Sequence, residues 1–372
     1  MILSSFNVHC FRNITHAEIN PSNRFNLFVG GNGSGKTSLL EAIHHLSVAR
    51  SFKTRFFKHV IQHGEKEFTL FGRMGDLSVG IMRARNGKSR IRIADKDVQS
   101  IAELAEQFPL QVINPDTYQL ITAGSKMRRK FVDWGVFHVE HEFITLWKQL
   151  YRVLRHRNAV LKEKVNFDSI KQRVEPWDTD FIGLSEQITR FRQMYVDELR
   201  PIFMELMQRL LNIARVRIEF RSGWSEERSL ESLLTSSLQR DIMLGHTQFG
   251  PHRADLLLYV GEHLAQDVLS RGQLKLLVCA MQLAQALLLE KKTNKKCVFL
   301  VDDLPSELDT EHRRALCGVL TELETQIFMT CIEQNAFIDL IKLPSTKVFQ
   351  VNLGNITPFE LNRSEKFVEI AI

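Results

Sequence analysis

Closely spaced cysteines are missing from this sequence of 372 residues. Its five cysteines are odd in number and widely scattered, and no two have the two-residue spacing of a metal knuckle or a redox pair. This argues against a disulfide framework, and we expect reduced core thiols. The first eleven residues have neither a basic flank nor a long apolar core, so no secretory signal is predicted there.

Long apolar runs and repeats are missing as well. The most apolar long segment, residues 276–289, is shorter than a membrane span and contains Gln282 and Gln285, so it favours a buried helix. The chain has no internal repeat, low-complexity run or sustained heptad pattern, which argues against coiled-coil arms. We therefore expect a soluble, cytoplasmic protein.

The composition is that of a folded protein with a small net positive charge. Lys and Arg number 49 against 43 Asp and Glu, a net charge of +6, and 44% of the residues are hydrophobic. This length and hydrophobic content suffice for one large domain or two lobes. The positive charge favours polyanions as partners.

The hydrophobic periodicity predicts strand-rich ends and a helical middle. Strand patterns occur at residues 1–6, 25–29, 68–74, 77–84, 89–94, 216–220, 255–260, 297–301, 326–330 and 347–352. Helical faces follow residue 131, and a further helix is expected at about 272–290. Pro201 is expected to kink or interrupt the long helical pattern around it. The alternation indicates an α/β fold.

A phosphate-binding loop follows the apolar run Phe25–Val29. The residues that fit G-x-x-x-x-G-K-[ST] are Gly30, Gly31, Asn32, Gly33, Ser34, Gly35, Lys36 and Thr37. Glycines let backbone amides face phosphate oxygens, and a helix opening at Ser38 adds its positive end. Lys36 is expected to reach the β- and γ-phosphates, and Thr37 to bind Mg²⁺. The alternative, a glycine-rich turn that binds nothing, does not explain the strand, the spacing, Lys36 and Thr37 together.

A second apolar strand pattern, residues 297–301, ends in paired carboxylates. We expect Asp302 to hold Mg²⁺ through water and Asp303 to polarise the attacking water, so that Asp303 and Lys36 are the candidate catalytic residues. The alternative is a pair of acids that closes a strand at a solvated turn.

A third motif opens the helix expected at 272–290. It consists of Leu269, Ser270, Arg271, Gly272 and Gln273. Ser270 is suited to cap the helix, Gly272 permits close approach of a phosphate, and the helix N-terminus favours an anion. Alone, this segment is equally well read as an ordinary capped helix.

Together the three motifs resemble the ABC ATPases, whose signature loop is LSxGQ and whose loop after the acidic strand is similar to Ser306-Glu307-Leu308-Asp309. The resemblance implies that the signature residues Ser270, Arg271, Gly272 and Gln273 of one subunit close on the γ-phosphate held by the other, in an ATP-dependent homodimer. In transporter-type ATPases the signature loop follows the phosphate loop much more closely in sequence. Because Ser270 lies far beyond Lys36 here, that class is disfavoured.

Further segments resemble the RecF family of bacterial recombination-mediator ATPases over nearly the whole chain. They include Phe11 to Ile14, Arg50 to Thr54, Asn114 to Asp116, Arg128 to Trp134, Arg157 to Ala159, Glu175 to Asp178, Gly250 to Asp255 and Leu269 to Leu277. This implies an ABC-type P-loop ATPase head like those of Rad50 and SMC proteins, without a coiled coil. The expected lobes are 1–125 with the P-loop and a β-meander, a mainly helical 126–295, and a return to the first lobe at 296–372.

The resemblance also implies a function. The protein would bind ATP, Mg²⁺ and DNA, act on single strands and gap junctions at the nucleoid, and help RecR and RecO load RecA in gap repair, replication restart and SOS induction. Arg12 and Asn13 would contact the base or ribose. A weak, DNA-stimulated ATPase is expected, because Asp303 is shorter than the glutamate of transporters and Thr330 stands where they have a histidine. The alternatives are a DNA-binding scaffold that holds ATP without turnover and an SMC/Rad50-type or transporter-type ATPase.

Three basic clusters are candidates for DNA contact: Arg50, Lys53, Arg55 and Lys58; Arg83, Arg85, Lys88, Arg90 and Arg92; and Lys126, Arg128, Arg129 and Lys130. The first is preferred, with Arg50, Lys53 and Arg55 as DNA-binding residues, because it follows the nucleotide helix. Core packing is favoured over base stacking for Phe52, Phe56 and Phe57. For His252 and Arg253 two interpretations stay open: their loop contacts the nucleotide, or it only turns the chain.

Overall fold

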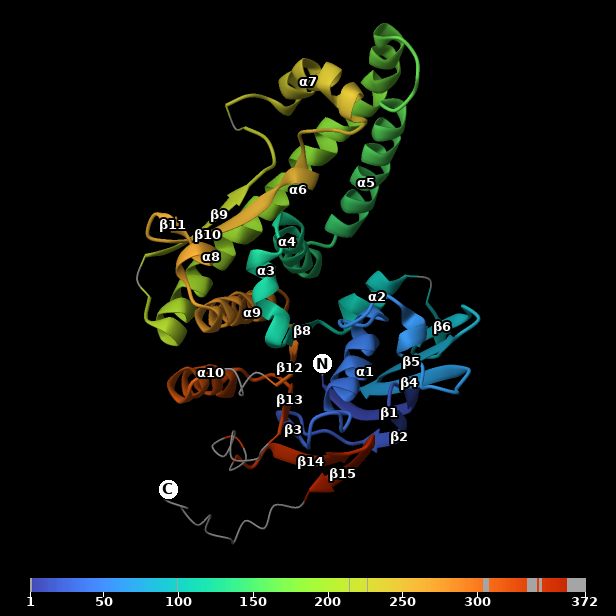
Figure 1. Ribbon diagram of the computed structural model, residues 1–372, viewed down its shortest axis with the longest axis vertical. Helices are drawn as coiled ribbons and strands as arrows, with labels where there is room; N and C mark the ends of the chain where they lie inside the picture. Colours follow the sequence, from blue (N-terminus) through green and yellow to red (C-terminus); the bar gives the residue numbers. More distant parts are fainter. Residues whose placement is uncertain are drawn as a thin grey trace. The chain divides into compact units, whose positions relative to one another are not determined.

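The computed structural model describes residues 2–98, 100–213, 215–225, 227–303, 308–332, 340 and 343–359. The chain forms two compact units, Met1–Pro115 with Lys295–Ile372 and Asp116–Asn294 (Figure 1). The first change of unit comes at Pro115, earlier than the expected boundary at 125, because the chain leaves its sheet there and continues as short helices of unit 2. The second comes at Asn294, next to the expected boundary at 295.

An antiparallel sheet forms one side of unit 1, with strand order β2-β1-β4-β5-β6-β7. Its strands are β1 (Leu3–Phe11), β2 (Ile14–Ile19), β4 (Glu67–Met74), β5 (Leu77–Ala84), β6 (Ser89–Ile93) and β7 (Lys96–Asp97). Gly87 has a φ of +92° in the turn between β5 and β6. The meander predicted at residues 68–94 is therefore confirmed.

A second sheet of unit 1 has the order β15-β14-β3-β13-β12-β8 and is parallel except at β14–β15. Its strands are β3 (Phe25–Val29), β8 (Leu110–Ile113), β12 (Val298–Val301), β13 (Ile327–Cys331), β14 (Thr346–Asn352) and β15 (Asn355–Phe359). Every residue of β3, β12 and β13 is buried, as continuous apolar runs in parallel sheets usually are. Their carboxyl ends meet at one edge, the usual ligand-binding edge of such a sheet.

Helix α1 (Lys36–Val48) joins the two sheets into one core. Its Leu39, Ile43 and Leu46 belong to a single buried cluster with Phe6 and Leu70 of the antiparallel sheet and with residues of the parallel sheet. Unit 1 also contains η1 (Phe57–His59), α2 (Ile101–Gln107) and α10 (Thr310–Glu322). Because α1 begins at the carboxyl end of β3, the core fixes the loop that connects them.

Unit 2 is mainly helical. Its helices are α3 (Gln119–Thr122), α4 (Ser125–Val139), α5 (Phe143–Val160), α6 (Phe167–Leu211), α7 (Leu230–Leu244), η3 (Pro251–Arg253), α8 (Ala265–Val268) and α9 (Arg271–Thr293), with η2 (Pro115–Tyr118) at its start. A small sheet, β11-β10-β9, is formed by β9 (Val216–Arg221), β10 (Asp255–Val260) and β11 (His263–Leu264). Helices α5 and α6 lie side by side (Figure 1). Helix α9 is apolar enough to span a bilayer by composition, but 78% of its apolar window is buried, as expected for a core helix.

The interruption predicted at Pro201 is wrong. Helix α6 runs without a break for 45 residues through both Pro176 and Pro201. Both prolines are exposed, while Leu199 and Phe203 on the other face are fully buried. Burial of that face outweighs the roughly 3 kcal/mol that a proline costs inside a helix.

Candidate nucleotide-binding site

The loop after β3 has the backbone geometry of a phosphate-binding loop. Gly33 and Gly35 have φ values of +75° and +118°, where other residues are strained. A Cβ at Gly30 would lie 2.2 Å from the carbonyl oxygen of Val351 on β14, so only glycine fits there. Gly35 is the N-cap of α1 and offers no side-chain cap, which leaves the first-turn amides of the helix available to an anion.

Lys36 lies folded against this loop. Its Nζ donates to the carbonyl oxygens of Gly30 at 2.5 Å and Gly31 at 2.9 Å. Burial lowers the pKa of Lys36, and the negative charge of Asp303 is the largest opposing influence. The ammonium group is thus held at the loop, in the same cavity as Asp302 and Asp303, which follow β12.

Two threonines hold the carboxylate that follows β12. Thr37 on α1 and Thr330 on β13 both donate to Asp302 Oδ1, each at 2.9 Å. The oxygen of Thr330 also accepts the backbone N–H of Asp303 at 2.9 Å. Asp303 has a φ of +49°, an uncommon conformation for aspartate, so the Thr330 hydroxyl fixes both acidic residues at once.

These groups suit a magnesium nucleoside triphosphate. The Thr37 hydroxyl and the Asp302 carboxylate are the hard oxygen donors that Mg²⁺ prefers. Ser34 Oγ is buried in the loop and has no hydrogen-bond partner among the described residues, as expected of a donor reserved for a ligand. The Lys36 ammonium and the helix N-terminus supply positive charge for the phosphates.

Arg12 and Asn13 border the same site. Asn13 Nδ2 donates to the Gly33 carbonyl oxygen at 3.4 Å. Arg12 makes a bidentate pair with Glu41 of α1, with both distances 2.9 Å, and a third bond to the His59 carbonyl oxygen. The Arg12 guanidinium therefore ties the β1–β2 turn to α1, and its direct contact with a nucleotide stays a prediction.

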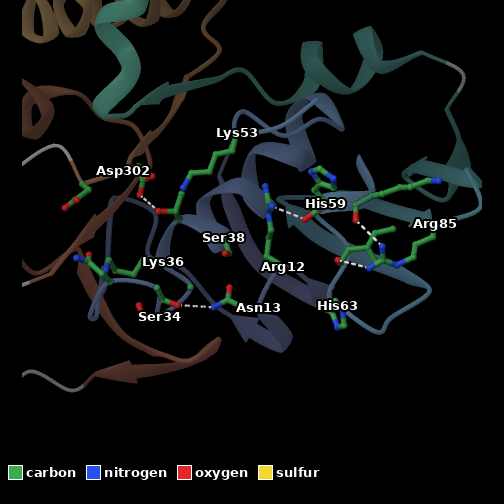
Figure 2. Close-up of a pocket in the computed structure, with 17 residues that line it drawn as sticks. Arg12, Asn13, Ser34, Lys36, Ser38, Lys53, His59, His63, Arg85 and Asp302 are labelled. Atoms are coloured by element: carbon green, nitrogen blue, oxygen red, sulfur yellow. Dashed lines mark hydrogen bonds between the residues drawn. The ribbon is translucent and has the colours of Figure 1, made fainter. Parts of the chain in front are cut away.

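A cavity of about 740 Å³ extends from the loop (Figure 2). It is lined by Arg12, Asn13, Asn32, Gly33, Ser34, Gly35, Lys36, Thr37, Ser38, Lys53, Lys58, His59, Ile61, His63, Arg85, Asp302 and Asp303. In Figure 2, Lys36 and Asp302 lie at one end, and His63 and Arg85 at the other. The sequence did not assign Lys53, Lys58, His59, His63 or Arg85 to this site, because these residues lie in and around η1 and after β5, and only the folded chain brings them to the loop.

The signature loop, Leu269–Gln273, begins α9 in unit 2. Gln273 N donates to Ser270 Oγ at 3.3 Å, and Ser270 N donates to Gln273 Oε1 at 3.0 Å, so the cap predicted at Ser270 is confirmed as a capping box. A Cβ at Gly272 would meet only Ser270 Oγ, at 4.0 Å, so packing within the described chain does not require this glycine. In the loop expected after the acidic strand, Asp309 caps α10, while Ser306 and Glu307 lie outside the described residues.

The basic clusters differ in how their charges are engaged. In the meander, Arg85 donates to four backbone carbonyl oxygens and Arg90 pairs with Asp97 at 2.9 Å. In unit 2, Arg128 makes a bidentate pair with Asp255, with both distances 2.8 Å. Arg50, Lys53, Arg55 and Lys58 are exposed. The first cluster thus keeps cationic groups at the surface beside the cavity.

His252 and Arg253 had two possible interpretations, a nucleotide contact or a turn of the chain. In the structure, His252 is a packing residue of unit 2. Its Nε2 lies 3.0 Å from the Thr247 carbonyl oxygen, its ring lies beside Phe181, and burial lowers its pKa to about 4. Arg253 follows it in the single turn η3.

Comparison with known proteins decides the family. Residues 2–353 match the family model described as RecF/RecN/SMC N terminal domain. The DNA replication and repair protein RecF of Shewanella denitrificans is 43% identical over 364 residues, which cover 97% of this chain and 100% of that protein. RecF of Pseudomonas fluorescens is 44% identical, covering 96% of this chain and 98% of its own. The chain belongs to the RecF family.

Solved structures agree with this fold. Structures of the recombination mediator RecF with ATP and with ATPrS, from the RecFOR pathway, match with a TM-score of 0.83 at 24% identity, covering 96% of this chain and 98% of theirs. An SMC head domain from Pyrococcus furiosus matches with a TM-score of 0.57 at 14% identity, covering 97% of this chain and 96% of its own. The predicted ABC-type ATPase head with a helical second lobe is therefore confirmed. RecF relatives are DNA replication and repair proteins.

Proposed function

We propose that this RecF-family protein is an ATP-dependent DNA-binding protein in which two copies close over ATP on DNA. It acts at single strands and at gap junctions, assists RecR and RecO in loading RecA, and so serves gap repair, replication restart and SOS induction. Hydrolysis is slow and stimulated by DNA. The protein works in the cytoplasm, at the nucleoid.

The observation that carries the proposal is the linkage of Thr37, Asp302 and Thr330 beside Lys36. It joins the phosphate loop to the carboxylates at the sheet edge where Mg²⁺ and a triphosphate would bind. We assign to the nucleotide site Gly30, Gly31, Asn32, Gly33, Ser34, Gly35, Lys36, Thr37 and Ser38, of which residues 32–38 line the cavity, with Arg12 and Asn13 at its border. The proposed binding of DNA and of partner proteins rests on similarity to other proteins. One is named for DNA replication and repair, and another for the RecFOR pathway.

Each side chain has a distinct role in this proposal. Lys36 would neutralise the β- and γ-phosphates, and Thr37, with Asp302 acting through water, would hold Mg²⁺. Asp303 polarises the attacking water, and its short carboxylate favours slow turnover. Ser270, Arg271, Gly272 and Gln273 of the second copy close the site at a helix N-terminus, which favours the γ-phosphate charge.

Sedimentation of the purified protein, with and without Mg²⁺-ATP and gapped DNA, tests this function. We expect a monomer-to-dimer shift with ATP and tighter DNA binding by the dimer. If mass and DNA affinity are the same with and without ATP, the proposed ATP-dependent dimerisation on DNA is wrong. If the dimer forms but single-turnover experiments detect no hydrolysis, the protein is a scaffold that holds ATP without turnover.

Thr330→Val is expected to raise the Mg²⁺ concentration needed for half-maximal hydrolysis by about 10- to 100-fold, the usual effect of losing a residue that orients a metal ligand. Valine has nearly the same shape but neither donates to Asp302 nor accepts from Asp303 N. ATPase rates over a Mg²⁺ titration measure this. Thr330→Ser restores the hydroxyl and is expected to return the titration toward wild type.

Thr325→Val is the matched control. Thr325 is also buried and donates to the backbone carbonyl of Cys297, but it precedes β13, whereas Thr330 lies near the other end of that strand. Its replacement is expected to lower thermal stability while leaving the Mg²⁺ dependence unchanged. An equal shift of the Mg²⁺ dependence in both valine variants would show that Thr330 acts only on stability.

A further inference from the structure

One aromatic side chain of the first basic cluster is not used by the core. Phe56 is 67% exposed. Phe52 and Phe57, which flank it in sequence, are partly buried and pack against the main core of unit 1. Core packing is thus confirmed for Phe52 and Phe57 and wrong for Phe56. Single exposed apolar side chains are common on protein surfaces, so the surroundings of Phe56 decide whether it marks a binding surface.

The surroundings of Phe56 are cationic. Lys53, Arg55 and Lys58 are exposed on the same short segment. The ring of exposed His59 lies 5.3 Å from the ring of Phe56, at an interplanar angle of 47°. Phe56 itself does not line the nucleotide cavity, although Lys53, Lys58 and His59 do. This surface therefore offers cationic groups and one aromatic face together, and the aromatic face lies outside the nucleotide cavity.

The backbone holds Phe56 in this outward position. Ser51 Oγ accepts the N–H groups of Lys53 and Thr54, both at 2.9 Å, and Thr54 Oγ1 accepts the N–H of Phe56 at 3.2 Å. Ser51 in turn donates to Glu41, which is buried on α1. A side chain on such a fixed turn loses little conformational entropy when it binds a partner.

We propose that Phe56 is a stacking platform for an unpaired base of single-stranded DNA, with Lys53, Arg55 and Lys58 on the flanking phosphates. The inference rests on the proposed DNA-binding function and adds that this surface prefers single-stranded DNA to duplex DNA. Away from the ends of a duplex, bases are already stacked on both neighbours, so there only an unpaired base offers a free face to the ring. The cations contact the backbone of either form and give no preference between them.

The test compares Phe56→Leu, Phe56→Trp and Phe167→Leu with wild type. Leucine keeps apolar bulk without an aromatic face, and tryptophan keeps the face. Phe167 is 44% exposed in unit 2 and serves as the matched control. Affinities for a single-stranded oligonucleotide and for a duplex of the same length are measured by fluorescence anisotropy with Mg²⁺-ATP. Quenching of 2-aminopurine in the single strand reports stacking directly.

We expect Phe56→Leu to weaken single-strand binding about 10-fold, within the range of base–aromatic stacking, and to abolish the quenching. Duplex affinity stays unchanged, and Phe56→Trp and Phe167→Leu behave like wild type. An unchanged single-strand affinity in Phe56→Leu, or an equal loss for both forms, overturns the stacking role while DNA binding stands. Wild type that binds neither form overturns the proposed DNA-binding function as well.

Discussion

Lys36→Ala is expected to abolish ATP-dependent dimerisation and to reduce hydrolysis by about 10²- to 10³-fold, the effect of removing one preorganised electrostatic group. The ammonium group is already held at the loop by the carbonyl oxygens of Gly30 and Gly31. Without it, a triphosphate would meet the carboxylates of Asp302 and Asp303 with less positive charge between them. Calorimetry with ATP and sedimentation with Mg²⁺-ATP measure the two losses.

Lys347→Ala is the control for this substitution. Lys347 lies in unit 1, and its Nζ donates to the backbone carbonyl oxygen of Asn20 at 2.7 Å, outside the nucleotide cavity. Its loss removes one positive charge from the same unit and is expected to leave ATP binding and dimerisation unchanged. Normal dimerisation by Lys36→Ala would contradict the assignment of this loop as the site that drives assembly.

The parts of the site that the sequence predicts are those encoded by adjacent residues. The P-loop follows from glycine spacing between an apolar strand and a helix, and the structure gives it the expected positive φ at Gly33 and Gly35. The cap at Ser270 follows from a serine placed just before an apolar helical pattern, and the structure adds its reciprocal bond with Gln273. Asp302 follows from an apolar run of strand length that ends in acids.

The parts that the sequence does not predict depend on distant residues. The far wall of the cavity exists because Arg85 donates to the carbonyl oxygens of Ile61 and Gln62, across a long stretch of chain. Arg12 has the position expected for a nucleotide contact, but its guanidinium is paired with Glu41. Thr330 reads as the end of a strand, and only the fold places its hydroxyl between Asp302 and Asp303. No periodicity or local motif encodes such contacts.

Ser270→Arg is expected to leave ATP binding by the single protomer intact and to abolish the ATP-dependent dimer. Ser270 and Arg271 are exposed at the start of the 23-residue helix α9, and the space beside Gly272 is open within the described chain. A second long cation would fill the space that the proposal assigns to the other copy's γ-phosphate. Calorimetry measures ATP binding by the protomer, and sedimentation measures ATP-dependent dimerisation.

Ser229→Arg provides the control for helix capping. Ser229 caps α7 in unit 2 by accepting the N–H of Ser232 at 3.2 Å, so its replacement carries the same cost of about 1 kcal/mol for a lost cap. If the Ser229 variant also fails to dimerise, the defect of Ser270→Arg reflects the stability of unit 2 and not the signature loop.

Mixing the two inactive variants gives the sharpest test that the site is shared between copies. In a heterodimer, the Ser270→Arg protomer supplies an intact P-loop and the Lys36→Ala protomer supplies an intact signature loop, so one composite site is complete and the other lacks both parts. We therefore expect the mixture to recover part of the ATP-dependent assembly and hydrolysis that neither variant has alone. A site built within one chain predicts no recovery, because each protomer would remain defective whatever its partner.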